Sequence, residues 1–200
     1  MSKVVVYIHG KGGNAGEAEH YQMLFPEDKV IGFDYQAETP WEAINEFPDY
    51  FQLLRKEFDS IVIVANSIGA FLTMHALRDI KIEKAFFISP VVNMEQLILD
   101  MMRWSGVTEE ELKEQGTIGT AVGETLSMEY LTWVRNHPVC WNVPTSILYG
   151  RNDHLQSIDT LKAFTEKNKN AELTVMENGE HWFHTDEQMR FLDEWIRAEN

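Results

Sequence analysis

Three residues that could together activate a hydroxyl nucleophile are spread along the chain. They are Ser67, Asp153 and His181, and each follows a short apolar segment. A serine hydroxyl is a weak nucleophile until a base removes its proton, and imidazole is the usual base. A carboxylate can hold that imidazole in the required tautomer and stabilise its charged form. These residue types therefore predict acyl-transfer chemistry, provided that the fold brings them together.

The residues beside Ser67 favour a nucleophile at this position. Ala65 and Gly69 each stand two residues from Ser67, between an apolar run and a helical pattern. Only small residues fit around the serine in the strand–turn–helix of a nucleophile elbow. A helix that starts at Ile68 would aim its N–H groups at a developing negative charge. Taken alone, a serine here would more often be a helix cap.

Rival residues of the same types lie close by. His184 stands three residues after His181 and is the main rival for the base, but choosing it would leave the turn at Gly179 without a role. His154 is a second histidine near the candidate acid. The rival carboxylates, Asp159 and Asp186, are expected to cap helices.

The glycine-rich turn after the first apolar run has two interpretations. Residues 10–15 satisfy the pattern G-x-G-x-x-G/A, and Asp34 stands about twenty residues further on. This pattern is the fingerprint of a dinucleotide-binding oxidoreductase. That interpretation leaves the serine, aspartate and histidine unexplained, so it remains the less favoured alternative.

The order of elements that must carry these residues is typical of an α/β fold. Short runs that are apolar through their centres alternate with helical patterns, as in a parallel sheet covered on both faces. The runs are residues 4–8, 29–33, 61–65, 85–88, 145–149 and 172–176. We predict a three-layer α/β/α sandwich with a mostly parallel sheet of about six strands.

The sequence indicates where two of the helices begin. Thr39 and Glu42 form a capping box with Pro40 at the first helical position. Pro48 interrupts the apolar pattern that follows, which predicts a kink or two short helices. Thr185 is expected to cap the last helix.

One segment of more than fifty residues, about 91–143, lacks a strand pattern. Helices are expected over 94–104, from Thr108 and from Ser127, with a loose glycine-rich stretch over 116–123. We interpret the segment as a helical lid inserted into a single domain that spans residues 1–200. Insertions of this kind often cover an active site.

The motifs and their order resemble those of the α/β-hydrolase family over nearly the whole chain outside the insertion. The resemblance implies Ser67 as nucleophile, Asp153 as acid and His181 as base. It also implies an oxyanion hole formed by the backbone N–H groups of Ile68 and Lys11. The sequence departs from the family in two ways: Ala65 replaces the usual glycine, and the family's first two strands are missing. It would thus be a minimal, six-stranded member without a cofactor or metal.

Composition narrows the possible partners. The chain has 200 residues, enough for one core, and 17 basic against 32 acidic residues give a net charge of −15. Such a charge disfavours nucleic acid and anionic membranes as partners. The single cysteine, Cys140, fits a reducing cytoplasmic compartment, and no run is long enough for a membrane span.

The favoured function is therefore a serine hydrolase of carboxylesterase type that acts on a small-molecule acyl substrate. Thioester, amide and C–C bond cleavage use the same residues and stay open. A hydrolase-like ligand receptor with negligible turnover is the alternative outside catalysis.

Overall fold

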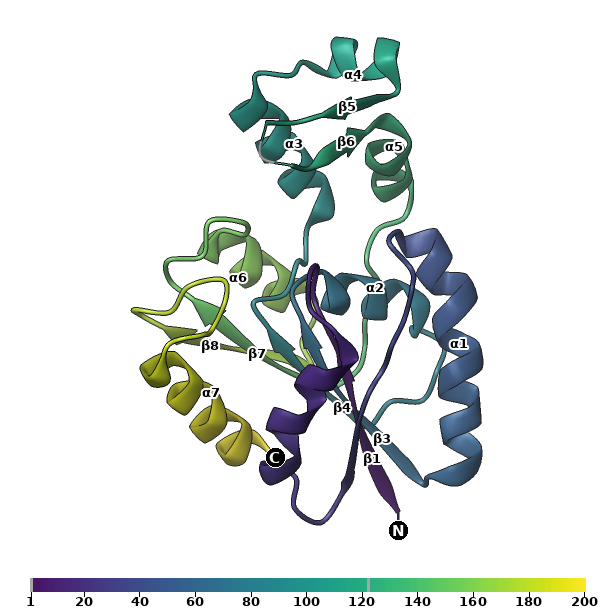
Figure 1. Cartoon of the computed structure of the whole chain (residues 1–200), viewed down its shortest axis with the longest axis vertical. Helices are drawn as coiled ribbons and strands as arrows, with labels where there is room; N and C mark the ends of the chain where they lie inside the picture. Colours follow the sequence, from purple (N-terminus) through teal and green to yellow (C-terminus); the bar gives the residue numbers. More distant parts are fainter. Residues whose placement is uncertain (1, 122) are drawn as a thin grey trace. The chain divides into compact units, whose positions relative to one another are not determined.

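The computed structural model describes residues 2–121 and 123–200, which form two compact units (Figure 1). The first unit combines the chain up to Val92 with Cys140–Asn200. The second unit is Asn93–Val139, so it is inserted into the first. Within the described ranges, no helix has both the length and the hydropathy needed to cross a membrane.

A six-stranded, wholly parallel sheet forms the centre of the first unit, as predicted. Its strands lie in the order β2-β1-β3-β4-β7-β8. They are β1 (Lys3–Ile8), β2 (Lys29–Gly32), β3 (Ser60–Asn66), β4 (Lys84–Ile88), β7 (Thr145–Gly150) and β8 (Ala171–Met176). The chain winds outward from β1 to β2 and then in the other direction from β3 onward. The carboxyl ends of β1 and β3 therefore flank the switch point, where ligands bind in open α/β sheets.

Helices cover both faces of this sheet, which confirms the three-layer architecture. They are η1 (Ala15–Met23, a 3-10 helix), α1 (Pro40–Glu57), α2 (Ile68–Ala76), α6 (Ile158–Lys167) and α7 (Asp186–Glu199). Tyr21 of η1 and Trp195 of α7 share one core cluster with Val5 and Tyr7 of β1. Successive residues of a strand point to opposite faces of the sheet. Val4 and the residues two and four positions after it therefore face the other layer, where α1 and α2 pack together.

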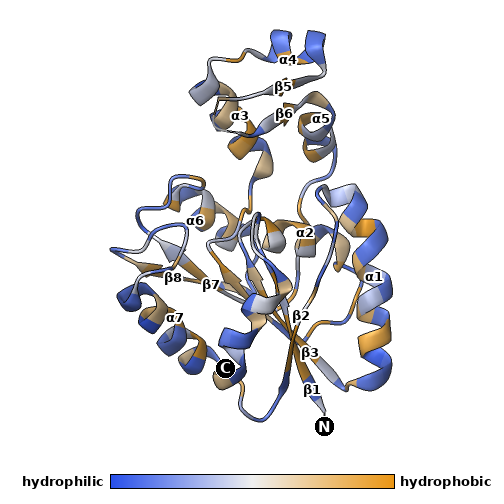
Figure 2. Cartoon of the chain, viewed as in Figure 1, coloured by the Kyte–Doolittle hydropathy of each residue, from blue (hydrophilic) through white to orange (hydrophobic). Residues whose placement is uncertain are grey.

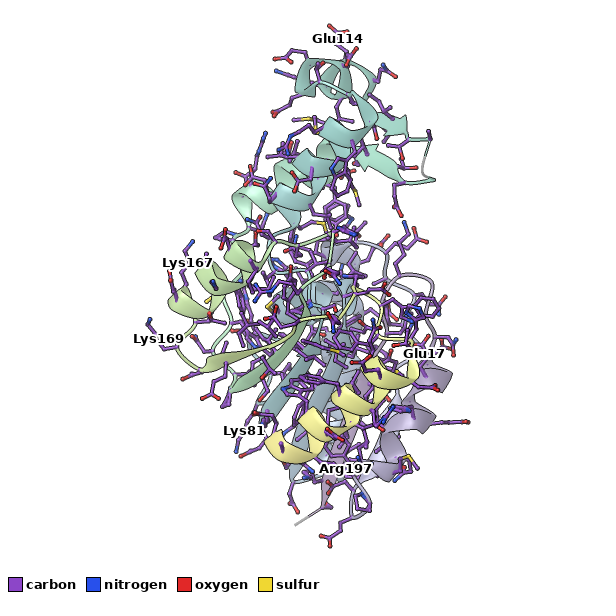
Figure 3. All side chains as sticks on the ribbon, turned by 90° about the vertical axis from the view of Figure 1, so that its left-hand side faces the viewer. Glu17, Lys81, Glu114, Lys167, Lys169 and Arg197 are labelled. Atoms are coloured by element: carbon purple, nitrogen blue, oxygen red, sulfur yellow. The ribbon has the colours of Figure 1, made fainter. Side chains whose placement is uncertain are left out.

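Burial of the sheet on both faces explains its unbroken apolar runs. Residues Val4 to Ile8 of β1 are all at most 1% exposed. Each such side chain contributes about 1.5–3 kcal/mol of hydrophobic stabilisation relative to an exposed one. Figure 2 shows the hydrophobic colour along the central strands and an alternation of hydrophobic and hydrophilic colour along the outer helices α1 and α7. Charged side chains such as Lys167 and Arg197 extend outward from α6 and α7 (Figure 3).

Helix α1 is one continuous helix of 18 residues, so the alternative of two short helices is wrong. The predicted capping box is present, with Thr39 accepting from the Glu42 N–H and Glu42 from the Thr39 N–H. Pro48 removes one backbone hydrogen bond from the helix interior. Phe47 and Phe51, one on each side of it, are fully buried against Phe33, and this packing holds the helix together.

The second unit is not purely helical, which corrects the expectation for residues 116–123. It contains α3 (Met94–Ser105), α4 (Glu109–Gln115), β5 (Thr117–Gly119), β6 (Thr125–Ser127) and α5 (Met128–Asn136). Strands β5 and β6 form an antiparallel pair in which Ile118 opposes Leu126. With three residues each, these strands are too short to show a two-residue alternation. The positive φ angles of Gly116 and Gly123, 77° and 85°, supply the backbone turns around the pair.

We predict that Gly32→Ala destabilises the first unit. A Cβ atom on Gly32 would lie 1.9 Å from the carbonyl oxygen of Ala15, so the start of η1 would have to move away from β2. The expected loss is about 1–3 kcal/mol in the free energy of unfolding, as for other overpacking substitutions, measured by urea unfolding. Gly119→Ala is the matched control, because a Cβ there has no heavy atom within 4 Å. Equal stability of the two variants would contradict the prediction.

Candidate active site

Ser67 occupies the sharp turn between β3 and α2, with φ 52° and ψ −120°. A residue with a Cβ rarely adopts this conformation, and such strain costs about 1–3 kcal/mol. Small neighbours make the turn possible. A Cβ atom on Gly69 would lie 2.4 Å from the His9 carbonyl oxygen, and one on Gly10 would lie 3.1 Å from Ser67 Cβ.

Backbone hydrogen bonds from the end of β4 hold this strained residue on both sides. The Ser67 N–H donates to the Ile88 carbonyl at 3.0 Å, and the Val91 N–H donates to the Ser67 carbonyl at 3.1 Å. Ser89, between these two partners, also has a positive φ of 44° and is completely buried. The sharp turn at Ser67 is thus held in place by a second turn with a positive φ angle, which follows the adjacent strand.

The three side chains singled out in the sequence lie in one hydrogen-bonded row. Ser67 Oγ is 2.8 Å from His181 Nε2, and His181 Nδ1 is 2.7 Å from Asp153 Oδ2. The serine follows β3, the aspartate follows β7, and the histidine lies between β8 and α7. Because a carboxylate only accepts, Nδ1 carries the proton and neutral Nε2 can accept from the serine hydroxyl. The hydrogen bonds of this row are therefore directed so that His181 can accept the proton of the Ser67 hydroxyl.

The Asp153 side chain is buried, and both of its oxygens have hydrogen-bond partners. Its side chain has no exposed surface, whereas that of His181 is 23% exposed. Its second oxygen, Oδ1, accepts from the backbone N–H groups of Leu155 at 2.7 Å and Gln156 at 3.3 Å. These donors compensate for the lost hydration of the buried carboxylate. The sequence pattern did not reveal them, because they are backbone groups of an irregular segment.

Close contact of two loops brings Asp153 to His181. A Cβ on Gly150 would lie 2.5 Å from the Gly179 carbonyl carbon, so only glycine allows the ends of β7 and β8 to approach this closely. The Asn152 N–H also donates to the Gly179 carbonyl at 2.8 Å. Gly179 therefore has the turn role that the sequence suggested. Gly150 was not singled out, although its position directly before the acid loop was a usable signal.

The rival residues have other partners. His184 Nδ1 binds the Trp182 carbonyl at 2.7 Å, and its ring stacks on the exposed Trp182 indole at 4.7 Å. Asp159 and Asp186 lie in the first turns of α6 and α7, where a carboxylate favours the helix dipole. The caps themselves are Ser157 and Thr185 rather than the two aspartates.

The glycine-rich turn lies directly against the elbow. The Gly13 N–H donates to the Gly10 carbonyl at 3.1 Å, and Gly12 has φ 75°, so residues 10–13 form a type II turn with Lys11 at its second position. The two predicted N–H donors are on Lys11 and Ile68. Lys11 follows Gly10, which lies beside Ser67, and Ile68 follows Ser67 itself. Ile68 is the first residue of α2, so its N–H has no helical carbonyl to bind.

The same turn is a poor dinucleotide site. A dinucleotide fingerprint places the pyrophosphate at the N-terminus of an α-helix. Here the turn leads into the 3-10 helix η1, where the side chain of Asn14 already accepts from the Gly16 N–H. The groove between η1 and β2 also contains Glu19, whose carboxylate would repel phosphate. Within residues 2–121 and 123–200, no group of three or more His, Cys, Asp and Glu side chains could hold a metal ion.

Comparison with known proteins identifies the fold. No family model and no curated protein matches the sequence. Among solved structures, Est1E from Butyrivibrio proteoclasticus is 19% identical, with a TM-score of 0.75 over 99% of this chain and 86% of its own. Mouse alpha/beta hydrolase domain-containing protein 10 is 15% identical, with a TM-score of 0.76 over 98% and 88%.

The Pyrococcus furiosus esterase Pf2001 is 20% identical, with a TM-score of 0.67 over 99% of this chain and 80% of its own. All three comparisons cover nearly the whole chain. The protein therefore has the α/β-hydrolase fold, and the resemblance predicted from the sequence is confirmed at the level of the fold.

We predict that Ser67→Gly is more stable than Ser67→Ala. Both changes remove the hydroxyl, but only glycine relieves the strain of a Cβ at φ 52°. Glycine loses more chain entropy on folding, about 0.5–1 kcal/mol, so the expected net difference is about 1 kcal/mol in favour of Ser67→Gly. Thermal unfolding of the two variants measures it. A more stable alanine variant would mean that the turn is not strained.

Proposed function

We propose that the protein is a serine hydrolase that cleaves carboxylic esters of small molecules through a Ser67–His181–Asp153 triad. The observation that carries the proposal is the hydrogen-bonded row from the serine hydroxyl to the buried carboxylate, 2.8 Å and 2.7 Å at its two links. The α/β-hydrolase fold supports the same chemistry, since this row lies at the carboxyl edge of its sheet.

In the proposed first step, Ser67 Oγ attacks the acyl carbon while His181 Nε2 removes its proton. The carbonyl electrons move onto oxygen, and the N–H groups of Lys11 and Ile68 stabilise this oxyanion. The bond to the leaving alkoxide then breaks as His181 returns the proton to it. Asp153 stabilises the imidazolium that exists between these events and does not itself take up the proton.

In the proposed second step, water replaces the alcohol. His181 removes a proton from the water as its oxygen attacks the acyl carbon of the acyl-enzyme. Collapse of the second tetrahedral intermediate breaks the bond to Ser67 Oγ, which regains a proton from His181, and the carboxylic acid leaves. No redox equivalent or cofactor enters this cycle.

Charge and structural relatives guide the choice of substrates. The net charge of −15 disfavours anionic esters by electrostatic steering, so uncharged esters are the preferred class. Est1E has been solved with ferulic acid bound, which makes aromatic acyl esters a useful part of a test panel. We place the reaction in the cytoplasm, where the exposed Cys140 would remain reduced.

Ser67→Ala is expected to lower kcat/KM for p-nitrophenyl acetate and butyrate by at least about 10³-fold and to abolish labelling by a fluorophosphonate, because both need the Oγ nucleophile. Purified wild type and variant are compared with both readouts. Ester hydrolysis that persists in the variant would contradict the proposal. Labelling of wild type without measurable turnover on a broad ester panel would instead indicate a receptor.

His181→Ala is expected to cause a loss comparable to that of Ser67→Ala, since the nucleophile would lose its base. His184→Ala is the matched control, because the same side chain is removed three residues away and its ring faces Trp182. We expect the control to keep kcat/KM within about threefold of wild type, a surface-substitution effect. Reversed effects of the two variants would assign the base to His184.

A further inference from the structure

The peptide between Gly10 and Lys11 has its direction fixed by two hydrogen bonds. The Gly10 carbonyl accepts from the Gly13 N–H at 3.1 Å and from His9 Nδ1 at 2.9 Å. Because a carbonyl only accepts, Nδ1 of His9 must carry a proton. In a trans peptide the C=O and N–H bonds point in opposite directions. Holding the Gly10 oxygen therefore also sets the direction of the Lys11 N–H.

His9 is in turn held by Tyr35, at both its ring and its backbone. The two rings stack at 4.3 Å with 15° between their planes. The Tyr35 hydroxyl donates to the His9 carbonyl at 2.8 Å. Gly69 lies against that carbonyl on the side of α2, as its close approach shows. The His9 peptide is thus enclosed between the tyrosine hydroxyl and the helix that follows the nucleophile.

Tyr35 is rigidly placed for this contact. It follows β2, is 7% exposed, and packs edge-on against Phe47 of α1 at 5.2 Å. Burial raises the pKa of its phenol well above the usual range, so the hydroxyl remains a donor at any working pH. Its hydroxyl donates to His9, and its ring packs on His9, Phe33 and Phe47. A role in positioning fits this location better than contact with the reacting atoms.

We propose that Tyr35 is a positioning residue that acts through His9 to aim the Lys11 N–H at the oxyanion. The proposal rests on the proposed function, since it assigns a task only if an oxyanion forms at Ser67. A peptide that can rotate stabilises the transition state less well but leaves ground-state binding almost unchanged. The predicted signature is therefore a loss in kcat rather than in KM.

The test is Tyr35→Phe, which keeps the stacked ring and removes only the donor to His9. We expect kcat for p-nitrophenyl butyrate to fall about tenfold with KM within twofold, a partial loss of one oxyanion donor. A trifluoromethyl ketone that forms a tetrahedral adduct with Ser67 should lose affinity by the same factor. The matching methyl ketone, which forms little adduct, should bind as tightly as before.

Tyr50→Phe is the matched control, since Tyr50 belongs to the same aromatic cluster but stacks on Phe33 at 4.2 Å instead of on His9. We expect it to retain wild-type kcat and trifluoromethyl ketone affinity. A loss in Tyr35→Phe no larger than in this control would overturn the inference. The inference would also be overturned if the loss in kcat came with the same fold loss in methyl ketone affinity and with a lower melting temperature. That result would indicate a structural role only.

A double-mutant cycle between Tyr35→Leu, which removes the ring together with the hydroxyl, and His9→Ala tests the contact between the two rings. In the His9→Ala background, Tyr35→Leu should cost no more than twofold beyond Tyr35→Phe, because the Tyr35 ring has lost its stacking partner and only the bond from its hydroxyl to the residue 9 carbonyl is left to lose. An extra loss for Tyr35→Leu that is as large in this background as in wild type would overturn the route through the His9 ring. An active wild type with an unaffected Tyr35→Phe defeats only this inference, whereas a wild type without Ser67-dependent turnover defeats the proposed function as well.

Discussion

The left-handed backbone of Ser67 is the constraint on which the rest of the site depends. A residue with a Cβ does not stay at φ 52° and ψ −120° unless its surroundings leave no alternative. Here the alternatives are excluded by Gly10 and Gly69, which let the glycine turn and α2 approach to contact distance, and by hydrogen bonds from the end of β4. The same turn lifts the hydroxyl out of the sheet edge toward His181.

The parallel sheet supplies the convergence that this strained turn needs. Every strand of the sheet runs in the same direction, so the segments after β1, β3, β7 and β8 all emerge at one edge. At this edge the Asp153 carboxylate is buried, and two backbone donors satisfy the oxygen that does not face the histidine. The scaffold thus holds this buried carboxylate between two backbone N–H groups and the His181 imidazole.

Much of this architecture could be predicted from the sequence, because its signals are local. Apolar runs buried on both faces marked all six strands of the main sheet, and Thr39 and Thr185 marked the starts of their helices. Sequence signals failed where tertiary packing overrides them, or where an element is too short to show a periodic pattern. Pro48 lies inside one helix because Phe47 and Phe51 anchor it, and β5 and β6 are too short to have a pattern.

The candidate site shows the same division. Ser67, Asp153 and His181 were found from residue type and order alone, and the structure places them within hydrogen-bonding distance. The contacts around them were not predictable in this way. The backbone donors to Asp153 have no sequence signature, and Tyr35 reaches His9 only because β2 pairs with β1. Such contacts follow from register and loop path, which no single sequence segment encodes.

The place of β1 in the sheet has a consequence for the way the chain is made. During synthesis this strand leaves the ribosome before either of its partners, and β3 ends only at Asn66. Its apolar segment, Val4 to Ile8, can pair with β2 once Gly32 has been translated, but its other partner is complete only about sixty residues after Ile8, at roughly 5–20 residues per second. The histidine arrives later still, 114 residues after the serine. Nascent chains of this protein thus spend several seconds with an incomplete β1 pairing before the centre of the sheet can form.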